Sequence, residues 1–288
     1  MAGRKGGAMK TNAFAYRRAD TVEDAVRIAR EEGDEARFLA GGQSLLAAMN
    51  FRLDEPTALI DISRIEDLRG VSRGDGEIVI GALTRHADIE ASPVIAEHLP
   101  LVAAAIREVA HPAIRNRGTF GGSLALADPA AELPACAVAL DARIHIAGPG
   151  GARAVAADDF FRGLYETALE PGELVTHVTV PLPAPEARHG FAELARRHGD
   201  YAMTGLAMMR APERTRVVYF ALSERPVRAR AAEAAIERGA SPADCAAVAD
   251  EGLDVLGDNS ASEATKRHYA RVLLRRALEA IASPETTS

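Results

Sequence analysis

The most informative stretch of this chain is Ile114-Arg-Asn-Arg-Gly-Thr-Phe-Gly-Gly-Ser-Leu-Ala-Leu-Ala-Asp-Pro-Ala-Ala-Glu-Leu-Pro-Ala135, in which three glycines precede a marked helix start. Gly118, Gly121 and Gly122 lack a Cβ and can adopt positive φ, which would let consecutive backbone N–H groups converge on a pyrophosphate. Asp128-Pro129 is predicted to supply the N-cap and first residue of a helix. An ordinary glycine turn before a helix is the alternative interpretation of this segment alone.

A second glycine loop is predicted within Phe38-Leu-Ala-Gly-Gly-Gln-Ser-Leu-Leu-Ala-Ala-Met-Asn-Phe-Arg-Leu53, between a short apolar strand and an amphipathic helix. Gly41 and Gly42 permit close approach of the backbone to a ligand, while Gln43 and Ser44 add side-chain donors. Free N–H groups at the start of the helix would face an anion. Neither loop has the G-x-G-x-x-G or P-loop spacing, so a nucleotide site of another design is indicated.

Both segments resemble motifs of the FAD-binding subunits of molybdenum hydroxylases, a family that includes the medium chain of aerobic carbon monoxide dehydrogenase and the flavin domain of xanthine dehydrogenase. The family carries Ala-Gly-Gly-Gln-Ser-Leu, then Arg-Leu and a Leu-Ile-Asp-Ile strand, and later Arg-Asn-x-Gly-Thr-Ile-Gly-Gly-Asn with a downstream Ala-Asp-Pro. The matching residues are Ala40 to Leu45, Arg52-Leu53, Leu59-Ile-Asp-Ile62, Arg115 to Gly122 and Ala127-Asp128-Pro129.

Three positions depart from the family pattern. Phe120 stands where isoleucine is usual, and Ala47 replaces a common proline, which should ease helix continuation. Ser123 stands where asparagine is usual. A serine hydroxyl lacks the paired donor and acceptor of an amide, so the ligand contact at this position is expected to be weaker or bridged by water.

The resemblance implies a fold of α/β and α+β type. A two-subdomain, PCMH-like FAD-binding domain is expected over residues 11–183, preceded by a short disordered extension over 1–10. A smaller α+β domain, with strands followed by helices, is expected over 184–288.

The resemblance also implies which residues bind FAD. The pyrophosphate would lie between the loops Ala40 to Ser44 and Thr119 to Ser123, with Glu132 accepting from a ribose hydroxyl or a related group. Val175 and the segment Arg196-Arg-His-Gly-Asp-Tyr-Ala202 would lie near the isoalloxazine ring. The expected cofactor-binding residues are Ala40, Gly41, Gly42, Gln43, Ser44, Leu45, Ala110, Thr119, Phe120, Gly121, Gly122, Ser123, Asp128, Glu132, Val175 and Asp200.

By the same resemblance the chain transfers electrons and contributes no catalytic residue to substrate chemistry. A large subunit would oxidise the substrate at a molybdenum cofactor, and a small subunit would pass electrons through two-iron, two-sulfur clusters to this flavin, in a dimer of heterotrimers. NAD, a quinone, oxygen or another molecule would be the acceptor. A self-contained flavin oxidoreductase and a non-redox nucleotide-binding assembly protein are the alternatives; a short second domain argues against the first, and a reducible bound flavin would exclude the second.

The cysteine and histidine content fits a chain that binds flavin and leaves the metal cofactors to partner subunits. Only Cys136 and Cys245 are present, whereas one two-iron, two-sulfur cluster needs four thiolates. Both are expected to be free thiols, and Cys136 to be a small buried hydrophobe in an apolar helix. The eight histidines have no paired-ligand spacing, so no metal site is expected.

Composition indicates a globular chain. Its 288 residues are 48% hydrophobic with a net charge of −7, and no apolar run is long enough to span a membrane. Nucleic acid is not expected as a partner, because basic residues do not form a stripe; the patches Arg196-Arg197 and Arg225 to Arg230 are interpreted as solvated faces or subunit contacts. The basic N-terminus lacks the apolar core of a signal peptide, so a cytoplasmic location is expected.

The pattern of apolar residues predicts alternating helices and strands with mixed sheets. Asp20-Thr21 is predicted to cap the first helix and Gly33 to end it, and Gly74-Asp-Gly76 is predicted to form a hairpin turn. In the first half, helices are expected at Val22 to Glu32, Thr84 to Glu90, Leu101 to Val109 and after Asp128, and strands at Arg37 to Ala40, Ala58 to Ile62, Glu77 to Leu83, Arg143 to Ile146 and Glu173 to Val180.

Pro181-Leu-Pro-Ala-Pro-Glu-Ala187 is the predicted domain boundary, since its prolines disfavour both helix and central strand. Beyond it, strands are expected at Phe191 to Arg196, Gly205 to Arg210 and Val217 to Leu222, and helices at Val227 to Glu237, Pro242 to Asp250 and Glu263 to Ile281.

Overall fold

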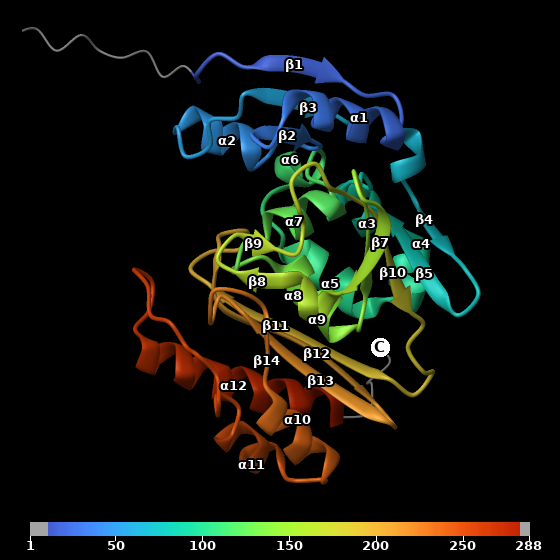
Figure 1. Ribbon diagram of the computed structural model, residues 1–288. Coiled ribbons are helices and arrows are strands. Elements are labelled where there is room, and N and C mark those ends of the chain that lie inside the picture. Colours follow the sequence, from blue (N-terminus) through green and yellow to red (C-terminus); the bar gives the residue numbers. More distant parts are fainter. Residues whose placement is uncertain (1–10, 283–288) are drawn as a thin grey trace, which may run out of the picture.

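The computed structural model describes residues 11–282, which form three stacked units (Figure 1). A small α/β unit lies at the top of Figure 1, helices beside an antiparallel sheet lie in the middle, and a second sheet backed by helices lies at the bottom. The expected combination of α/β and α+β folds is therefore confirmed. The predicted extension 1–10 falls outside the described residues.

The top unit is a parallel sheet in the order β1-β3-β2. Parallel strands need crossover connections, and two helices supply them. Thr21 caps the first helix by accepting from the Asp24 N–H at 3.1 Å, and Gly33 ends it with a φ of 84°. The elements are β1 (Ala15–Arg18), α1 (Val22–Glu32), β2 (Ala36–Leu39), α2 (Leu45–Asn50) and the buried central β3 (Ala58–Asp61).

The middle sheet is antiparallel throughout, in the order β4-β5-β10-β6-β7. The prediction of mixed sheets is wrong, because tight turns join β4 to β5 and β6 to β7 and impose antiparallel pairing. The first of these turns is the predicted Gly74-Asp-Gly76 hairpin. The elements are the 3₁₀ turn η1 (Glu66–Leu68), β4 (Val71–Arg73), β5 (Glu77–Gly81), β6 (Arg143–Gly148), β7 (Gly151–Ala156), β10 (Leu174–Pro181) and the separate hairpin β8 (Phe161–Gly163) with β9 (Glu166–Thr167).

Short helices pack beside this sheet (Figure 1). They are α3 (His86–Glu90), α4 (Pro93–His98), α5 (Pro100–Glu108), α6 (Pro112–Arg115), α7 (Phe120–Leu126), α8 (Glu132–Ala139) and α9 (Ala157–Phe160). Every residue of α8 is buried, as expected for a helix surrounded by other elements. Cys136 lies in it as a buried free thiol, and Cys245 is also free and buried, so both cysteine predictions are confirmed.

The bottom unit is an antiparallel sheet in the order β11-β12-β13-β14. Strands come first and helices follow, as predicted. The elements are β11 (Arg188–Ala195), β12 (Ala202–Ala211), β13 (Arg214–Phe220), β14 (Val227–Arg228), α10 (Arg230–Glu237), α11 (Pro242–Ala247) and α12 (Glu263–Ala282). Tyr219 faces the helices and donates to the Ala270 carbonyl at 2.8 Å, while Phe220 faces the middle unit and joins its core.

The middle and bottom units therefore share one hydrophobic core. Ile144 of β6 and Leu133 of α8 belong to the same buried cluster as Phe220 of β13. The proline-rich segment 181–187 connects the end of β10 to the start of β11. The division into domains 11–183 and 184–288 stays a prediction, because this shared core does not itself mark a boundary.

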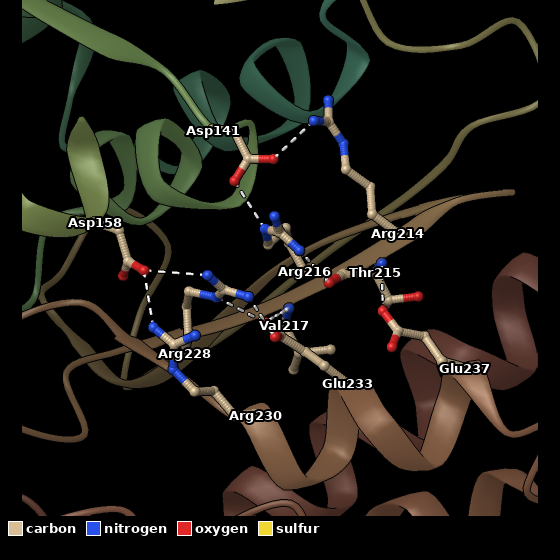
Figure 2. Close-up of polar contacts among 10 residues, drawn as sticks. All are labelled: Asp141, Asp158, Arg214, Thr215, Arg216, Val217, Arg228, Arg230, Glu233 and Glu237. Carbon is tan, nitrogen blue, oxygen red and sulfur yellow. Dashed lines mark hydrogen bonds and ion pairs between the residues drawn. The ribbon is translucent and has the colours of Figure 1, made fainter.

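Ion pairs reinforce the junction (Figure 2). Asp141, just after α8, accepts a hydrogen bond from Arg216 at 2.7 Å and forms an ion pair with Arg214 at 3.1 Å, both on β13. Because one carboxylate holds two cations from the facing strand, it ties the end of α8 to the sheet.

A second carboxylate does the same further along the junction (Figure 2). Asp158 of α9 accepts from Arg228 at 3.1 Å and from Arg230 at 3.0 Å. Arg228 also pairs with the buried Glu233 at 2.6 Å. The interpretation of the patch Arg225 to Arg230 as a solvated face is thus wrong for Arg228, whose guanidinium is held inside the molecule.

Arg228→Ala is expected to lower the free energy of unfolding by about 3 kcal/mol, because it leaves the buried Glu233 carboxylate without its cationic partner. Arg230→Ala removes a contact of nearly equal length to the same Asp158, but its side chain is 69% exposed against 13% for Arg228. It should cost less than about 1 kcal/mol. Denaturant unfolding of the two variants makes the comparison, and equal losses would contradict the assigned role.

Candidate functional site

The structure brings the two glycine loops into direct contact. A Cβ at Gly41 would lie 2.1 Å from the Arg117 carbonyl oxygen, a separation that no side chain tolerates. Gly42 has a φ of 72°, a conformation that glycine adopts without strain. The packing of the first loop on the second thus depends on these glycines.

The first loop presents a run of available donors. The backbone N–H groups of residues 41–45 have no acceptor among the residues that the structure describes. Gln43 Nε2 donates to the Gly41 carbonyl at 3.2 Å and braces the loop, and Ser44 is exposed with no side-chain cap bond. Ala40, half-buried, leads into this run, and Leu45 begins α2. Consecutive free N–H groups of this kind form an anion-binding nest.

The second loop differs, because most of its backbone N–H groups already have acceptors within the fold; its predicted contact with a pyrophosphate stays a prediction. Phe120 and Gly121 donate their N–H groups to the Thr84 and Ala82 carbonyls at 2.9 and 2.8 Å. Thr119 caps the unpredicted helix α7 and accepts from the Gly122 N–H at 3.2 Å. Gly118, Gly121 and Gly122 are also absent from the positive-φ glycines of the described chain. Their N–H groups are therefore committed within the fold.

Close packing explains two of these glycines instead. A Cβ at Gly121 would lie 2.5 Å from the Ala82 Cβ, and one at Gly118 would lie 2.9 Å from His86 Nδ1. The second loop is thus pressed against the segment after β5. Its contribution to a site is a rigid wall that supports the first loop.

His86, which sequence reasoning missed, fastens this wall. Its Nε2 lies 3.0 Å from the Thr119 carbonyl and 3.1 Å from Ser123 Oγ. Burial lowers the pKa of His86 to about 4, so the ring is neutral near pH 7. A neutral ring that donates from Nε2 to Thr119 leaves the Ser123 hydroxyl proton free for a ligand. A lone histidine carries no motif that would have identified it.

Asp128 and Glu132 follow the second loop as buried carboxyls. Asp128 accepts from the Ala130 N–H at 2.9 Å in a turn, and α8 begins only at Glu132, with Ala131 at the cap. The prediction that Asp128-Pro129 starts the helix is therefore wrong by three residues. Burial raises the pKa of Asp128, and burial, together with the nearby charges of Asp128 and Glu108, raises the pKa of Glu132 to about 7.

A third carboxyl, Glu193 of β11, belongs to the same cluster. Its Oε2 is buried without a hydrogen-bond partner among the described residues. Burial, and then the charges of Glu132 and Glu108, raise the pKa of Glu193 to about 8. The site therefore includes carboxyls that retain protons near neutral pH.

Two tyrosines lie beside these carboxyls. Tyr201 is 77% exposed, and Tyr165 is 57% exposed with a φ of 55°. Partial burial and the charge of Asp128 raise the pKa of both phenols. Exposed aromatic rings beside buried polar groups are suited to cover a planar ligand. The sequence analysis placed the segment 196–202 near the flavin ring but counted only Asp200, an exposed turn residue, and not Tyr201, among the expected cofactor-binding residues.

The remaining predicted residues lie around this region. Ala110 follows α5 with a φ of 46°, and its carbonyl faces Gly199. Val175 is buried in the shared core on β10, next to Thr176, whose carbonyl accepts from the Ala82 N–H at 2.9 Å. Packing in the core is sufficient to explain a buried valine at position 175, and the contact of Val175 with a flavin ring stays a prediction.

Within residues 11–282, no group of three or more histidine, cysteine, aspartate or glutamate side chains is arranged to hold a metal ion. Within the same range, no helix combines the length and apolar character that crossing a membrane requires.

The sequence model of the FAD binding domain in molybdopterin dehydrogenase matches residues 12–183. This chain belongs to that family of flavin-binding domains, as the resemblance of its two loops predicted.

Known relatives agree with this assignment. The carbon monoxide dehydrogenase medium chain of Hydrogenophaga pseudoflava is 40% identical over 196 residues, which cover 68% of each chain. The caffeine dehydrogenase subunit beta of Pseudomonas sp. (strain CBB1) is 33% identical over 280 residues, covering 94% of this chain and 95% of that one. The solved structure of a Hydrogenophaga pseudoflava carbon monoxide dehydrogenase lacking the Mo-pyranopterin moiety contains a chain that matches with a TM-score of 0.90 and 35% identity, covering 95% of this chain and 98% of that chain.

Glu132→Gln tests the electrostatics of the site. The folded-state pKa of about 7 lies above the ordinary value of 4.5, so the folded chain binds the proton more tightly. This residue's contribution to stability therefore falls as pH rises from about 4.5 to about 7. The variant should gain about 3 kcal/mol relative to the parent chain between pH 4 and pH 8.

Unfolding free energies at the two pH values measure this gain, with the exposed Glu186→Gln as the matched control. The control should shift the unfolding free energy equally at both pH values. A Glu132→Gln effect that does not depend on pH would show that the carboxyl is not held protonated.

Proposed function

We propose that this chain is the FAD-binding, electron-transferring subunit of a heteromeric molybdenum hydroxylase. The observation that carries the proposal is the run of free backbone N–H groups at residues 41–45, held against the second loop in a domain of the flavin-binding family. A pyrophosphate is the ligand that such a run of donors suits best.

Different residues of the site would bind different parts of FAD. The loop Ala40 to Leu45 would hold the pyrophosphate, and the wall Thr119 to Ser123 would shape its other side, with the Ser123 hydroxyl as a donor. Glu132 would accept from a ribose hydroxyl or a related group. Tyr201 would cover the isoalloxazine ring, with Asp200 and Ala110 near it and Val175 beneath. When bound, FAD supplies the ability to take electrons singly and to release two together.

The cysteine content of the chain bears on which partner subunits it needs. Two cysteines cannot ligate an iron–sulfur cluster, so electrons must arrive from other polypeptides. The names of the relatives describe a medium chain and subunits of dehydrogenases. We infer a small iron–sulfur subunit, a large molybdenum-cofactor subunit and a dimer of such heterotrimers, in the cytoplasm, with NAD, a quinone or oxygen as the acceptor.

The purified chain or its complex should release one FAD per copy on acid treatment, and Gly41→Ala should lower this ratio at least about tenfold, because the new Cβ would separate the loops. Gly150→Ala is the matched control, since nothing lies within 4 Å of its added Cβ, and it should keep the parent ratio. Chromatographic analysis of the released flavin gives the measurement. Release of FMN, or full FAD retention by folded Gly41→Ala, would reject the assignment.

Turnover should require the partner subunits. The isolated chain is expected to show no dehydrogenase activity on substrates of molybdenum hydroxylases, although its flavin can accept electrons from an artificial donor. Size-exclusion chromatography of co-expressed subunits should give a complex with the polypeptides in equal amounts. Substrate hydroxylation by the isolated chain, or no association with an iron–sulfur subunit encoded beside it, would overturn the proposal.

A further inference from the structure

Arg115 belongs to the second glycine motif, yet its guanidinium is directed into the protein. The residue is 8% exposed, and its Nε and Nη2 approach the two carboxylate oxygens of Glu90 at 2.9 and 3.4 Å. This fork-to-fork pairing fixes the orientation of the guanidinium plane. A guanidinium held in this way is not available to a phosphate in the cofactor loops.

The remaining guanidinium nitrogen acts on the segment after α5. Nη1 donates to the Val109 carbonyl at 3.0 Å and to the Ala110 carbonyl at 3.1 Å. These carbonyls follow the helix end, where no further backbone partner is supplied by α5 itself. Ala110 adopts a φ of 46°, a conformation that is costly for a residue with a Cβ. Arg115 therefore stabilises a strained turn.

That turn is the surface on which the Tyr201 segment lies. Gly199 has a φ of 81°, and a Cβ there would be 2.9 Å from the Ala110 carbonyl oxygen and equally close to the His111 ring. One residue earlier, His198 Nδ1 lies 3.0 Å from Glu108 Oε2 at the end of α5. The segment 196–201 thus contacts the end of α5 and the turn after it at two neighbouring points, and Tyr201 lies two residues after Gly199.

We propose that Arg115 is a positioning residue that, through the Val109–Ala110 turn, fixes the segment 196–201 and with it the ring of Tyr201 over the cofactor site. The part of this proposal that concerns the flavin rests on the function proposed above. A series of contacts runs from Glu90 on α3 through Arg115 to Ala110 and then to Gly199. It links the FAD-binding motif in the middle of the chain to the signature at the start of β12.

Lysine cannot replace arginine in this role. A single ammonium group has no planar fork to hold both Glu90 oxygens while it also donates to two carbonyls. Arg115→Lys should therefore show an intermediate effect, whereas Arg115→Gln loses the Glu90 ion pair together with most of the donors to the turn.

Trypsin tests the positioning role without any flavin. Arg196 and Arg197 are exposed tryptic sites within the segment, and their cleavage rate in the apo chain reports how often the segment opens. Arg115→Gln should raise cleavage at these two sites by about tenfold, while Arg107→Gln, an exposed arginine at the end of α5, should leave it unchanged. Gly199→Ala, which disturbs the same contact from the other side, should reproduce the increase.

Two outcomes would overturn the proposal. Cleavage at Arg196 and Arg197 that stays at the parent rate in Arg115→Gln would show that the turn does not hold the segment. Equal acceleration at every tryptic site in both Arg115→Gln and Arg115→Lys would show a general loss of stability. The apo measurement stands even if the chain binds no FAD, so failure of this inference and failure of the proposed function are distinguishable.

A double-mutant cycle tests the connection to Tyr201 in the FAD-loaded chain. Tyr201→Ala should increase flavin fluorescence, because a stacked tyrosine quenches it. Arg115→Gln should produce part of the same increase in the parent background and none in the Tyr201→Ala background, since residues that act through one contact are not additive. An equal increase in both backgrounds would contradict the proposed route.

Discussion

The close approach of Gly41 to the Arg117 carbonyl is the constraint on which the site depends. This contact leaves no space for a Cβ, so it fixes both the residue type and the distance between the top and middle units. The loop that carries the donors of residues 41–45 is supported by the second loop at this contact. That loop is itself held by hydrogen bonds to residues 82–86.

Burial of charge is the second constraint. The helix α8 lies between the middle unit and the lower sheet, and its first residue, Glu132, is only 9% exposed. Asp141, just after α8, and Asp158, near the start of α9, are matched by arginines of the lower unit, whereas Glu132 and Glu193 have no such cation among residues 11–282. Paired carboxylates therefore hold the units together, and the unpaired ones have raised pKa values beside the cofactor site.

Sequence reasoning succeeded where local signals were strong. The first helix was predicted to the residue because Thr21 and Gly33 mark its ends, and the order of strands and helices after residue 188 followed from clear periodicity. Short elements such as α6 and α7 were missed, since four to seven residues give too little periodicity to detect. The glycines of the second loop were predicted to bind a ligand, which stays a prediction; the structure adds that Gly121 and Gly118 make room for Ala82 and His86, a proximity that only the tertiary fold reveals.

The two glycine loops thus perform different tasks with the same residue type. In the first loop, glycine allows a backbone conformation whose N–H donors have no acceptor within the described residues. In the second loop, glycine allows the start of α7 to pack where a side chain would not fit. A ligand between them would meet most of its backbone donors on the side of residues 41–45, because the N–H groups of Gly118, Phe120, Gly121 and Gly122 already have acceptors within the fold. Affinity for an anion is therefore concentrated in residues 41–45, while the wall, Arg115 and the segment 196–201 determine where the rest of the cofactor lies.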